Sequence, residues 1–270
     1  MTKSLLWKKR YYRIVNPKTN KTLIVALEHG ATLGPVRGIE DLGETIKKIM
    51  EGLPDAILIT PGIASAYSDL FLGKNSPSIV LRCDRISIEP DAVRPISSVA
   101  DAEDLGADAI MVFMVAGFYN ANVTFDNIEL VAKLASECRQ AAMPLIVETT
   151  AWGIRIPEEE KLDVRHLRPI ARQAAELGAD LLKIPYPGDV ASFKEILRTC
   201  PVPCTVLGGP EAGSEKEFLQ MVKDAIDSGA AGATVGRNIW SRDNPAGMVR
   251  ALMKIIHEDA SVEEALKEIL

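Results

Sequence analysis

The chain has 270 residues, of which 47% are hydrophobic and 25% charged, and its formal net charge is −6. This composition is typical of a globular protein, and the acidic balance gives no reason to expect nucleic acid or an anionic membrane as a partner. No apolar run reaches the roughly 18 residues that a membrane span needs. The N-terminus lacks the features of a secretory signal and the four cysteines form no CxxC pair, so we expect a cytoplasmic protein with reduced thiols.

Short β-branched runs alternate with longer amphipathic stretches along the chain. The predicted strands cover residues 22–27, 56–60, 79–83, 109–115, 144–149, 180–184, 203–208 and 232–237. The predicted helices cover residues 41–52, 125–141, 164–178, 191–200 and 214–229. Continuously apolar strands separated by helices are typical of parallel sheets, and eight such units predict an α/β fold of the TIM (β/α)8 barrel type. An open doubly wound sheet would need a glycine-rich fingerprint after its first strand, where the sequence reads EHGATLG.

The domain organisation is expected to be simple, because no linker or low-complexity segment divides the chain. We predict one barrel domain over residues 1–270, with an N-terminal extension at 1–20 and a terminal helix at 261–270. Ser261 and Glu264 have the spacing of a capping box at the start of that helix.

Three scattered histidines make a histidine-rich metal site improbable, and His166 and His257 are expected at the surface of helices.

The C-terminal ends of barrel strands form the active sites of such folds, and here they carry polar residues and glycines. The relevant residues are Glu28 and His29, Arg82 and Asp84, Glu148, Thr150 and Trp152, Lys183 and Tyr186, Gly208 and Gly209, and Gly236 and Arg237. Carboxylates and a lysine are therefore expected to converge at one end of the barrel. Arg82 is expected either to line the pocket or to pair with Asp84.

Lys183 interrupts the apolar run DLLKIP at residues 180–185. A partly dry pocket at a strand end favours a neutral lysine amine, which can attack a carbonyl and form a Schiff base. The alternative interpretation is a structural lysine that pairs with a core carboxylate such as Glu28 or extends its ammonium group to solvent.

The ends of the last two predicted strands have the pattern of a phosphate site. Gly208, Gly209 and Gly236 leave backbone N–H groups accessible, and Arg237 adds a guanidinium group. Phosphate commonly binds at this position in TIM barrels. Alternatively, the glycines only make tight turns and Arg237 pairs with Asp243.

Four stretches resemble the archaeal-type class I fructose-bisphosphate aldolase family, which includes aminodideoxyheptulosonate synthases and autoinducer-2 phosphate thiolases. They are EHG…GP (28–30 and 34–35), DLLKIPYPGD (180–189), CPVPCTVLGGP (200–210) and VGRNIWSRDNP (235–245). The resemblance extends from about residue 20 to 258. It implies a Schiff-base lysine at Lys183, phosphate binding by the glycines and Arg237, no metal or other cofactor, and a homo-oligomer, often a decamer.

The sequence departs from the family pattern at three positions. Glu28 stands where aspartate is usual, and in TAWG (150–153) Thr150 replaces the tyrosine proton donor and Trp152 an arginine. Proton transfer is then assigned to Glu28, to Tyr186, or to a water held by Thr150 or Glu148. His29 is expected to orient its neighbours, and Trp152 either closes an apolar wall or packs in the core. Loss of the arginine weakens the case for a second phosphate on the substrate.

Three functions remain open from the sequence. The first is a Schiff-base-forming aldolase-like lyase acting on dihydroxyacetone phosphate or a phosphorylated ketose. The second is a transferase that moves an acyl or ketol group, as the thiolase or heptulosonate synthase relatives do. The third is a phosphosugar-binding barrel without catalytic activity.

Overall fold

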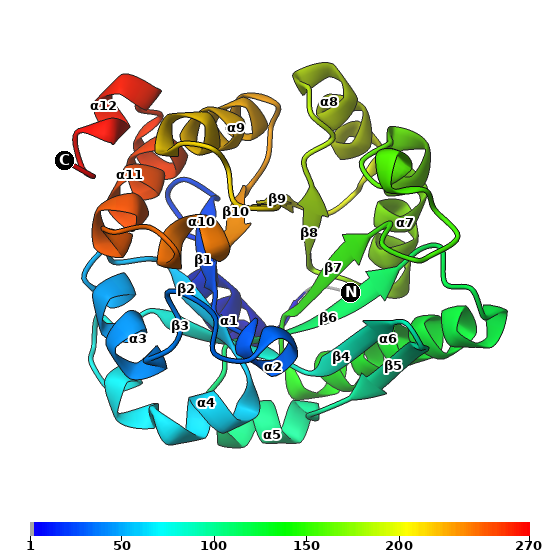
Figure 1. Ribbon diagram of the computed structural model, residues 1–270. Helices are drawn as coiled ribbons and strands as arrows, with labels where there is room; N and C mark the ends of the chain where they lie inside the picture. The colour runs from blue at the N-terminus through cyan, green and yellow to red at the C-terminus, as the bar shows by residue number, and fades with distance from the viewer. Residues whose placement is uncertain (1–2) are drawn as a thin grey trace.

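Within residues 3–270, which the computed structural model describes, eight parallel strands close into a barrel (Figure 1). Around the barrel they follow the order β1-β10-β9-β8-β7-β6-β3-β2. Their bounds are β1 Thr22–Ala26, β2 Ala56–Ile59, β3 Ser78–Arg82, β6 Ala109–Val115, β7 Leu145–Thr150, β8 Leu181–Pro185, β9 Cys204–Leu207 and β10 Gly232–Val235. The predicted TIM barrel is confirmed, and each predicted strand overlaps one strand of the barrel.

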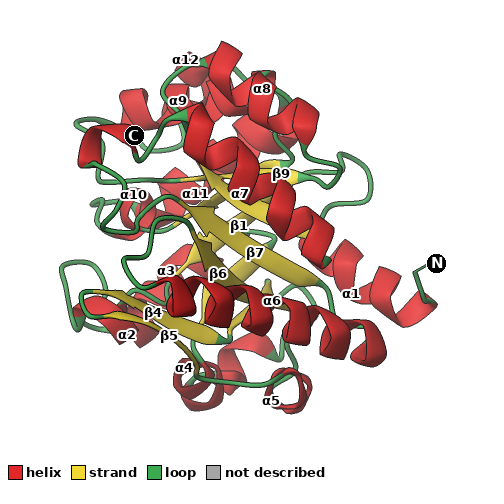
Figure 2. Ribbon diagram, turned by 90° about the vertical axis from the view of Figure 1, so that its right-hand side faces the viewer, coloured by secondary structure: helices red, strands yellow, loops and turns green. Residues whose placement is uncertain are grey.

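Helices surround the barrel and connect successive strands (Figure 2). The longer helices are α3 Leu42–Met50, α4 Pro61–Ala66, α5 Val99–Asp104, α6 Ala121–Ala141, α7 Val164–Leu177, α8 Val190–Thr199, α9 Glu215–Asp227 and α11 Pro245–Glu258. Short helical turns are α2 Gly30–Leu33, η1 Ser68–Phe71, η2 Glu158–Glu160 and α10 Arg237–Trp240. Helix α6 begins four residues before its predicted start, because the Asn120 side chain accepts a hydrogen bond from the Asn122 N–H and caps it there.

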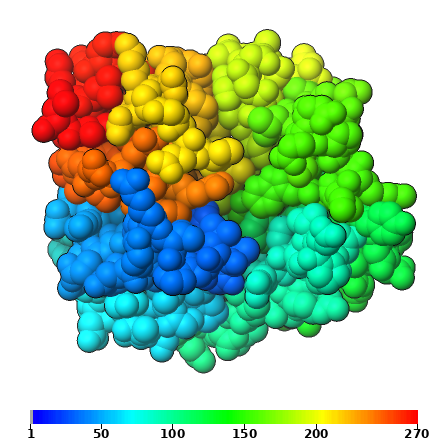
Figure 3. Space-filling model, in the orientation of Figure 1, coloured from blue at the N-terminus to red at the C-terminus, as the bar shows by residue number. Residues whose placement is uncertain are grey.

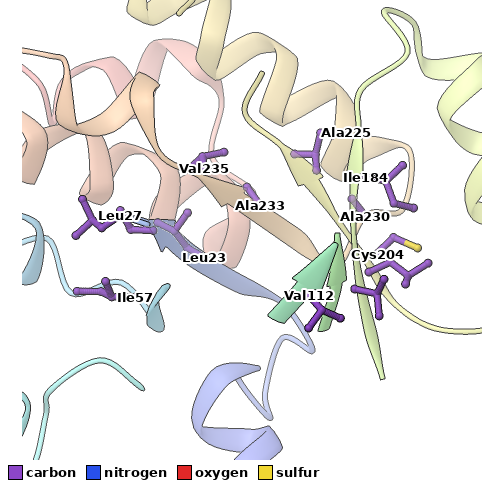
Figure 4. Close-up of a cluster of buried hydrophobic side chains, with 14 of the residues drawn as sticks. Leu23, Leu27, Ile57, Val112, Ile184, Cys204, Ala225, Ala230, Ala233 and Val235 are labelled. Carbon is purple, nitrogen blue, oxygen red and sulfur yellow. The ribbon is translucent and has the colours of Figure 1, made fainter. Parts of the chain in front are cut away.

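Each barrel strand is buried on both faces. Leu23 and Val25 of β1 pack outward against the helices, whereas Ile24 and Ala26 pack inside the barrel. Figure 4 shows part of the outer layer, where the strand residue Ile184 and the helix residue Ala225 belong to the same apolar cluster. This burial on both faces explains why the strands are continuous apolar runs.

The N-terminal segment forms helix α1, Leu5–Ile14, which the sequence did not predict. Ile14 and Val15 belong to the apolar cluster inside the barrel, so this segment closes the N-terminal end of the barrel. Figure 2 shows α1 at one end of the barrel and α2 and α10 at the other. At the opposite terminus of the chain, α12 spans Val262–Leu266 and begins with the reciprocal Ser261–Glu264 capping box.

A second unpredicted feature is an antiparallel hairpin directly after β3. Its strands are β4 Asp84–Ile88 and β5 Asp91–Pro95, and Ile86 pairs with Val93. The hairpin lies beside α6 at the same end of the barrel as α2 (Figures 1 and 2). It therefore stands at the edge of the C-terminal end of the barrel.

The expectation that His257 lies at the surface is wrong. Its side chain is 10% exposed and contacts Asp55 at 2.9 Å and Thr19 at 2.8 Å. The same Asp55 carboxylate accepts the Leu23 N–H, so this group ties helix α11 to the start of the barrel.

In the part of the chain that the structure describes, no helix has the length and apolarity to cross a bilayer.

Candidate active site

A cavity of about 860 Å³ lies at the C-terminal ends of the barrel strands. Its lining includes the predicted site residues Glu28, His29, Arg82, Asp84, Glu148, Trp152, Lys183, Tyr186, Gly208, Gly209, Gly236 and Arg237. Figure 3 shows this face of the molecule, where segments from the N-terminal, middle and C-terminal parts of the chain meet near the centre. The barrel thus brings together residues that are more than 200 positions apart in the sequence.

Lys183 lies at the floor of this cavity. Strand alternation explains its direction, because Leu181, two residues earlier, packs inside the barrel. The Lys183 side chain is 2% exposed, and its Nζ lies 2.9 Å from Glu148 Oε1 and 3.9 Å from Glu28 Oε1. The contact with Glu148 follows from register, since the two residues are paired across β7 and β8. Lys183 is therefore a buried amine with two carboxylates in reach.

Arg82 links the same two carboxylates from the other side. Its Nη2 hydrogen-bonds Glu148 Oε2 and lies 3.0 Å from Glu28 Oε1, and its guanidinium stands 3.9 Å from the centre of the Phe113 ring. The Asp84 carboxylate is farther away, with its Oδ1 3.7 Å from Arg82 Nη1. Both roles considered from the sequence are met, because Arg82 lines the cavity and contacts Asp84. Its shortest contacts with Glu28 and Glu148 were not foreseen.

Burial and charge act in opposite directions on the carboxyl groups. Burial alone would raise the pKa of Glu28, but the positive charge of Lys183, with smaller effects of His29 and Arg82, lowers it well below its usual range. For Asp84 burial prevails over Arg82 and the Phe113 N–H, and raises its pKa to about 7. Glu28 is therefore ionised at neutral pH, whereas Asp84 titrates near neutrality.

The other predicted residues of the catalytic set lie at different depths. His29 Nδ1 is 3.5 Å from Glu28 Oε2, and the His29 ring packs edge-on against Trp240. Tyr186 lines the cavity and packs against Phe193, and burial raises its pKa. Thr150 is fully buried at the end of β7 and is not among the described residues that line the cavity.

The glycines of the predicted phosphate cradle lie in the loop after β9 and in the turn that begins α10. Gly209 has φ +65°, a backbone conformation that favours glycine, and a Cβ on Gly236 would lie 2.6 Å from the Ala26 carbonyl oxygen. The exposed Arg237 donates to the Gly209 carbonyl at 3.3 Å. Asp243 lies 3.5 Å from Arg37, so the alternative pairing of Arg237 with Asp243 is not what the structure has.

Asn238 is a buried residue of this cradle that the sequence analysis did not single out. Its amide nitrogen donates to the Gly208 and Pro210 carbonyls, and its oxygen accepts the Ala212 N–H at 2.8 Å. These bonds hold the loop over α10. The signal was present in the sequence as GRN at 236–238, where a polar residue follows the glycine and arginine.

The fold and the cavity define the class of protein: a (β/α)8 barrel whose polar side chains gather at the C-terminal ends of its strands, where such folds carry their active sites. Comparison with known proteins gives the family. The model of the DeoC/LacD family aldolases matches residues 22–242, and the chain belongs to that family.

Curated relatives carry different names. A 2-amino-3,7-dideoxy-D-threo-hept-6-ulosonate synthase from Archaeoglobus fulgidus is 34% identical, over 96% of this chain and 94% of its own length. A 3-hydroxy-5-phosphonooxypentane-2,4-dione thiolase from Yersinia enterocolitica is 31% identical, over 99% of this chain and 88% of its own. Among solved structures, an archaeal fructose-1,6-bisphosphate aldolase whose catalytic lysine is bound to a carbinolamine intermediate is 25% identical, with a TM-score of 0.82 over 93% of this chain and 99% of that one.

Proposed function

We propose that this chain is a lysine-dependent aldolase that forms a Schiff base between Lys183 and the carbonyl of a phosphorylated ketone. One observation carries the proposal: the buried Lys183 Nζ lies 2.9 Å from Glu148 in the cavity that also contains the glycine cradle and Arg237. The solved relative with a lysine-bound carbinolamine supports it. Dihydroxyacetone phosphate and ketose phosphates fit because they carry a ketone close to a phosphate.

The two glutamates supply the proton transfers. A proton passes from Nζ to Glu148, and the freed nitrogen lone pair forms a bond to the carbonyl carbon while the C=O electron pair moves to oxygen. Glu28 takes a second proton from the nitrogen while Glu148 returns its proton to the oxygen, which gives the neutral carbinolamine. Glu28 then protonates the carbinolamine hydroxyl, and water leaves as the nitrogen lone pair forms the iminium ion. Glu148 is the nearer proton carrier and Glu28, at 3.9 Å, the second.

Carbon–carbon cleavage then uses the iminium ion as an electron sink. Loss of the proton from the substrate hydroxyl forms the aldehyde, and the electrons of the broken C–C bond pass into the iminium to give an enamine. Protonation of the enamine carbon and hydrolysis by water release the ketone phosphate and restore Lys183. The phosphate is held by backbone N–H groups at Gly208, Gly209 and Gly236 and by Arg237.

Borohydride trapping tests this mechanism directly. The protein is incubated with dihydroxyacetone phosphate and borohydride, and peptide mass spectrometry locates the reduced adduct. We expect the adduct on Lys183, its loss in Lys183→Met, and its retention in Lys194→Met, an exposed lysine on α8. A wild-type protein that gives no adduct with any ketose phosphate refutes Schiff-base chemistry here.

A transferase is the second candidate, and the position of Thr150 favours it. The residue that replaces the family's tyrosine is buried outside the cavity lining, so this chain does not use the lyase's usual proton donor. The synthase and thiolase names of the relatives agree with such chemistry. Product release measured with and without coenzyme A or an added aldehyde discriminates between the two reactions, because only a transferase depends on the acceptor.

A barrel that binds phosphosugars without turnover is the remaining alternative. It predicts that ligands bind, that no adduct is trapped, and that Lys183→Met keeps the wild-type affinity. The carboxylates that surround Lys183 argue against this alternative, because a binding protein has no use for two proton carriers beside a buried amine.

A further inference from the structure

One wall of the cavity is apolar and lies opposite the glycine cradle. Ile86 and Ile88 of the hairpin pack in one cluster with Phe113 and Trp152, and all four line the cavity. Ile96, which follows the hairpin, also lines the cavity and is 42% exposed. We call these five residues the hairpin wall. An exposed apolar surface of this kind, inside a cavity, is typical of a binding site.

The strand order places this wall across the barrel from the phosphate cradle. The cradle follows the neighbouring strands β9 and β10. In the order of the closed barrel, β3 and β6 lie opposite that pair, and the hairpin follows β3 and contacts β6. Lys183, on β8, lies between the two sides. A substrate held by its phosphate at the cradle and by its carbonyl at Lys183 therefore directs its far end toward the hairpin wall.

The charged residues that line the cavity leave little unpaired positive charge to bind a second phosphate. Among the described residues, the cationic lining consists of Arg82, Arg85, Lys183 and Arg237, and the acidic lining of Glu28, Asp84, Glu89, Glu148 and Glu217. Arg82 and Lys183 are already paired with glutamates, and Arg237 belongs to the cradle. Arg85 remains, and the acidic residue Glu89 of the same hairpin segment also lines the cavity.

We propose that the hairpin wall binds an uncharged, apolar end of the substrate, so that the substrate carries a single phosphate. This inference rests on the proposed function and names its substrate class: a monophosphate whose far end, or whose acceptor aldehyde, is apolar. The hairpin wall is then the element that selects the acceptor, and the hairpin is the specificity-determining insertion of this barrel.

Binding calorimetry on the full chain tests the inference with three probes. Hexyl phosphate and hexane-1,6-diyl bisphosphate have the same chain and differ only in the second phosphate, and glycerol phosphate reports the cradle alone. We expect hexyl phosphate to bind at least tenfold more tightly than glycerol phosphate or the bisphosphate, because its methylene groups move out of water and pack against the hairpin wall. Ile88→Ser and Ile96→Ser are each expected to weaken hexyl phosphate at least fivefold more than glycerol phosphate.

Two results overturn the inference and leave the proposed function standing. In the first, hexyl phosphate binds no more tightly than glycerol phosphate. In the second, the bisphosphate binds most tightly of the three probes and loses that advantage in Arg85→Met. In both cases trapping at Lys183 still occurs. If none of the three probes binds and no adduct forms, the cradle and the proposed function fail together with the inference.

Discussion

Replacing Arg82 with methionine removes the cation that joins the two glutamates of the site. Arg82 is 2% exposed, and its removal leaves Glu28 and Glu148 with Lys183 as their shared cation. The side chain of methionine retains part of the packing against Phe113 but offers no hydrogen-bond donor. Arg82→Met is therefore expected to destabilise the fold through an uncompensated buried carboxylate.

The magnitude follows from the burial of the group. Removing one partner of a buried ion pair destabilises a protein by about 3–5 kcal/mol. Loss of the cation–π contact, 3.9 Å from the Phe113 ring centre, acts in the same direction. For a chain of this size, 1 kcal/mol corresponds to roughly 2–4 °C, so the midpoint of thermal unfolding should fall by about 10 °C.

Urea unfolding and differential scanning calorimetry measure this loss, with Arg165→Met as the matched control. Arg165 also pairs with a carboxylate, Asp163, but its side chain is 71% exposed, so the control should leave the midpoint unchanged. The deficit of Arg82→Met should be larger at pH 8 than at pH 5, because the uncompensated carboxylates can accept protons in acid. A loss below about 1 kcal/mol, or one independent of pH, would refute the reasoning.

Three further predictions address the site. Glu148→Gln should slow imine trapping at Lys183 by about 100-fold or more, because the amide cannot accept the Nζ proton, and an unchanged initial trapping rate would exclude Glu148 as the proton carrier. The raised pKa of Asp84, about 7 against 3.8, means that this group stabilises the folded state at low pH and loses that contribution as the pH rises through 7. Asp84→Asn should therefore reduce the fall in unfolding free energy between pH 5 and pH 8 by up to about 3 kcal/mol, and equal pH dependence in both proteins would contradict this assignment. Asn238→Ala should weaken glycerol phosphate binding about tenfold, because the carbonyls of the cradle loop lose their donor, while trapping with unphosphorylated dihydroxyacetone stays near the wild-type rate; a dissociation constant that does not change would remove Asn238 from the cradle.

The barrel strands were predictable because each depends on a local pattern. Apolar runs bounded by polar residues indicate buried parallel strands, and eight of them alternating with helices leave few topologies. The hairpin β4–β5 was missed because its strands have only five residues each and contain few apolar residues. Helix α1 was missed because its docking depends on the end of a barrel that exists only after closure.

The candidate site shows the same division. The positions of Lys183 and Glu28 at strand ends, and of the glycines beside Arg237, follow from the strand boundaries alone. The partners of Arg82 do not follow from the strand boundaries. The sequence suggested Asp84, two residues away, whereas the shortest contacts are with Glu28 and Glu148, 54 and 66 residues away.

The sequence by itself thus determined the type of fold, the end of the barrel that carries the site, and the side chains available there. Only the tertiary structure decided which carboxylate lies beside Lys183, that Thr150 stays outside the cavity lining, and that the isoleucines of the hairpin line the same cavity as the glycines of the predicted phosphate cradle. The physical reason is that strand direction and burial are encoded within a few neighbouring residues. Contacts across the barrel depend on closure and on register, such as the pairing of Glu148 with Lys183, which no local pattern contains.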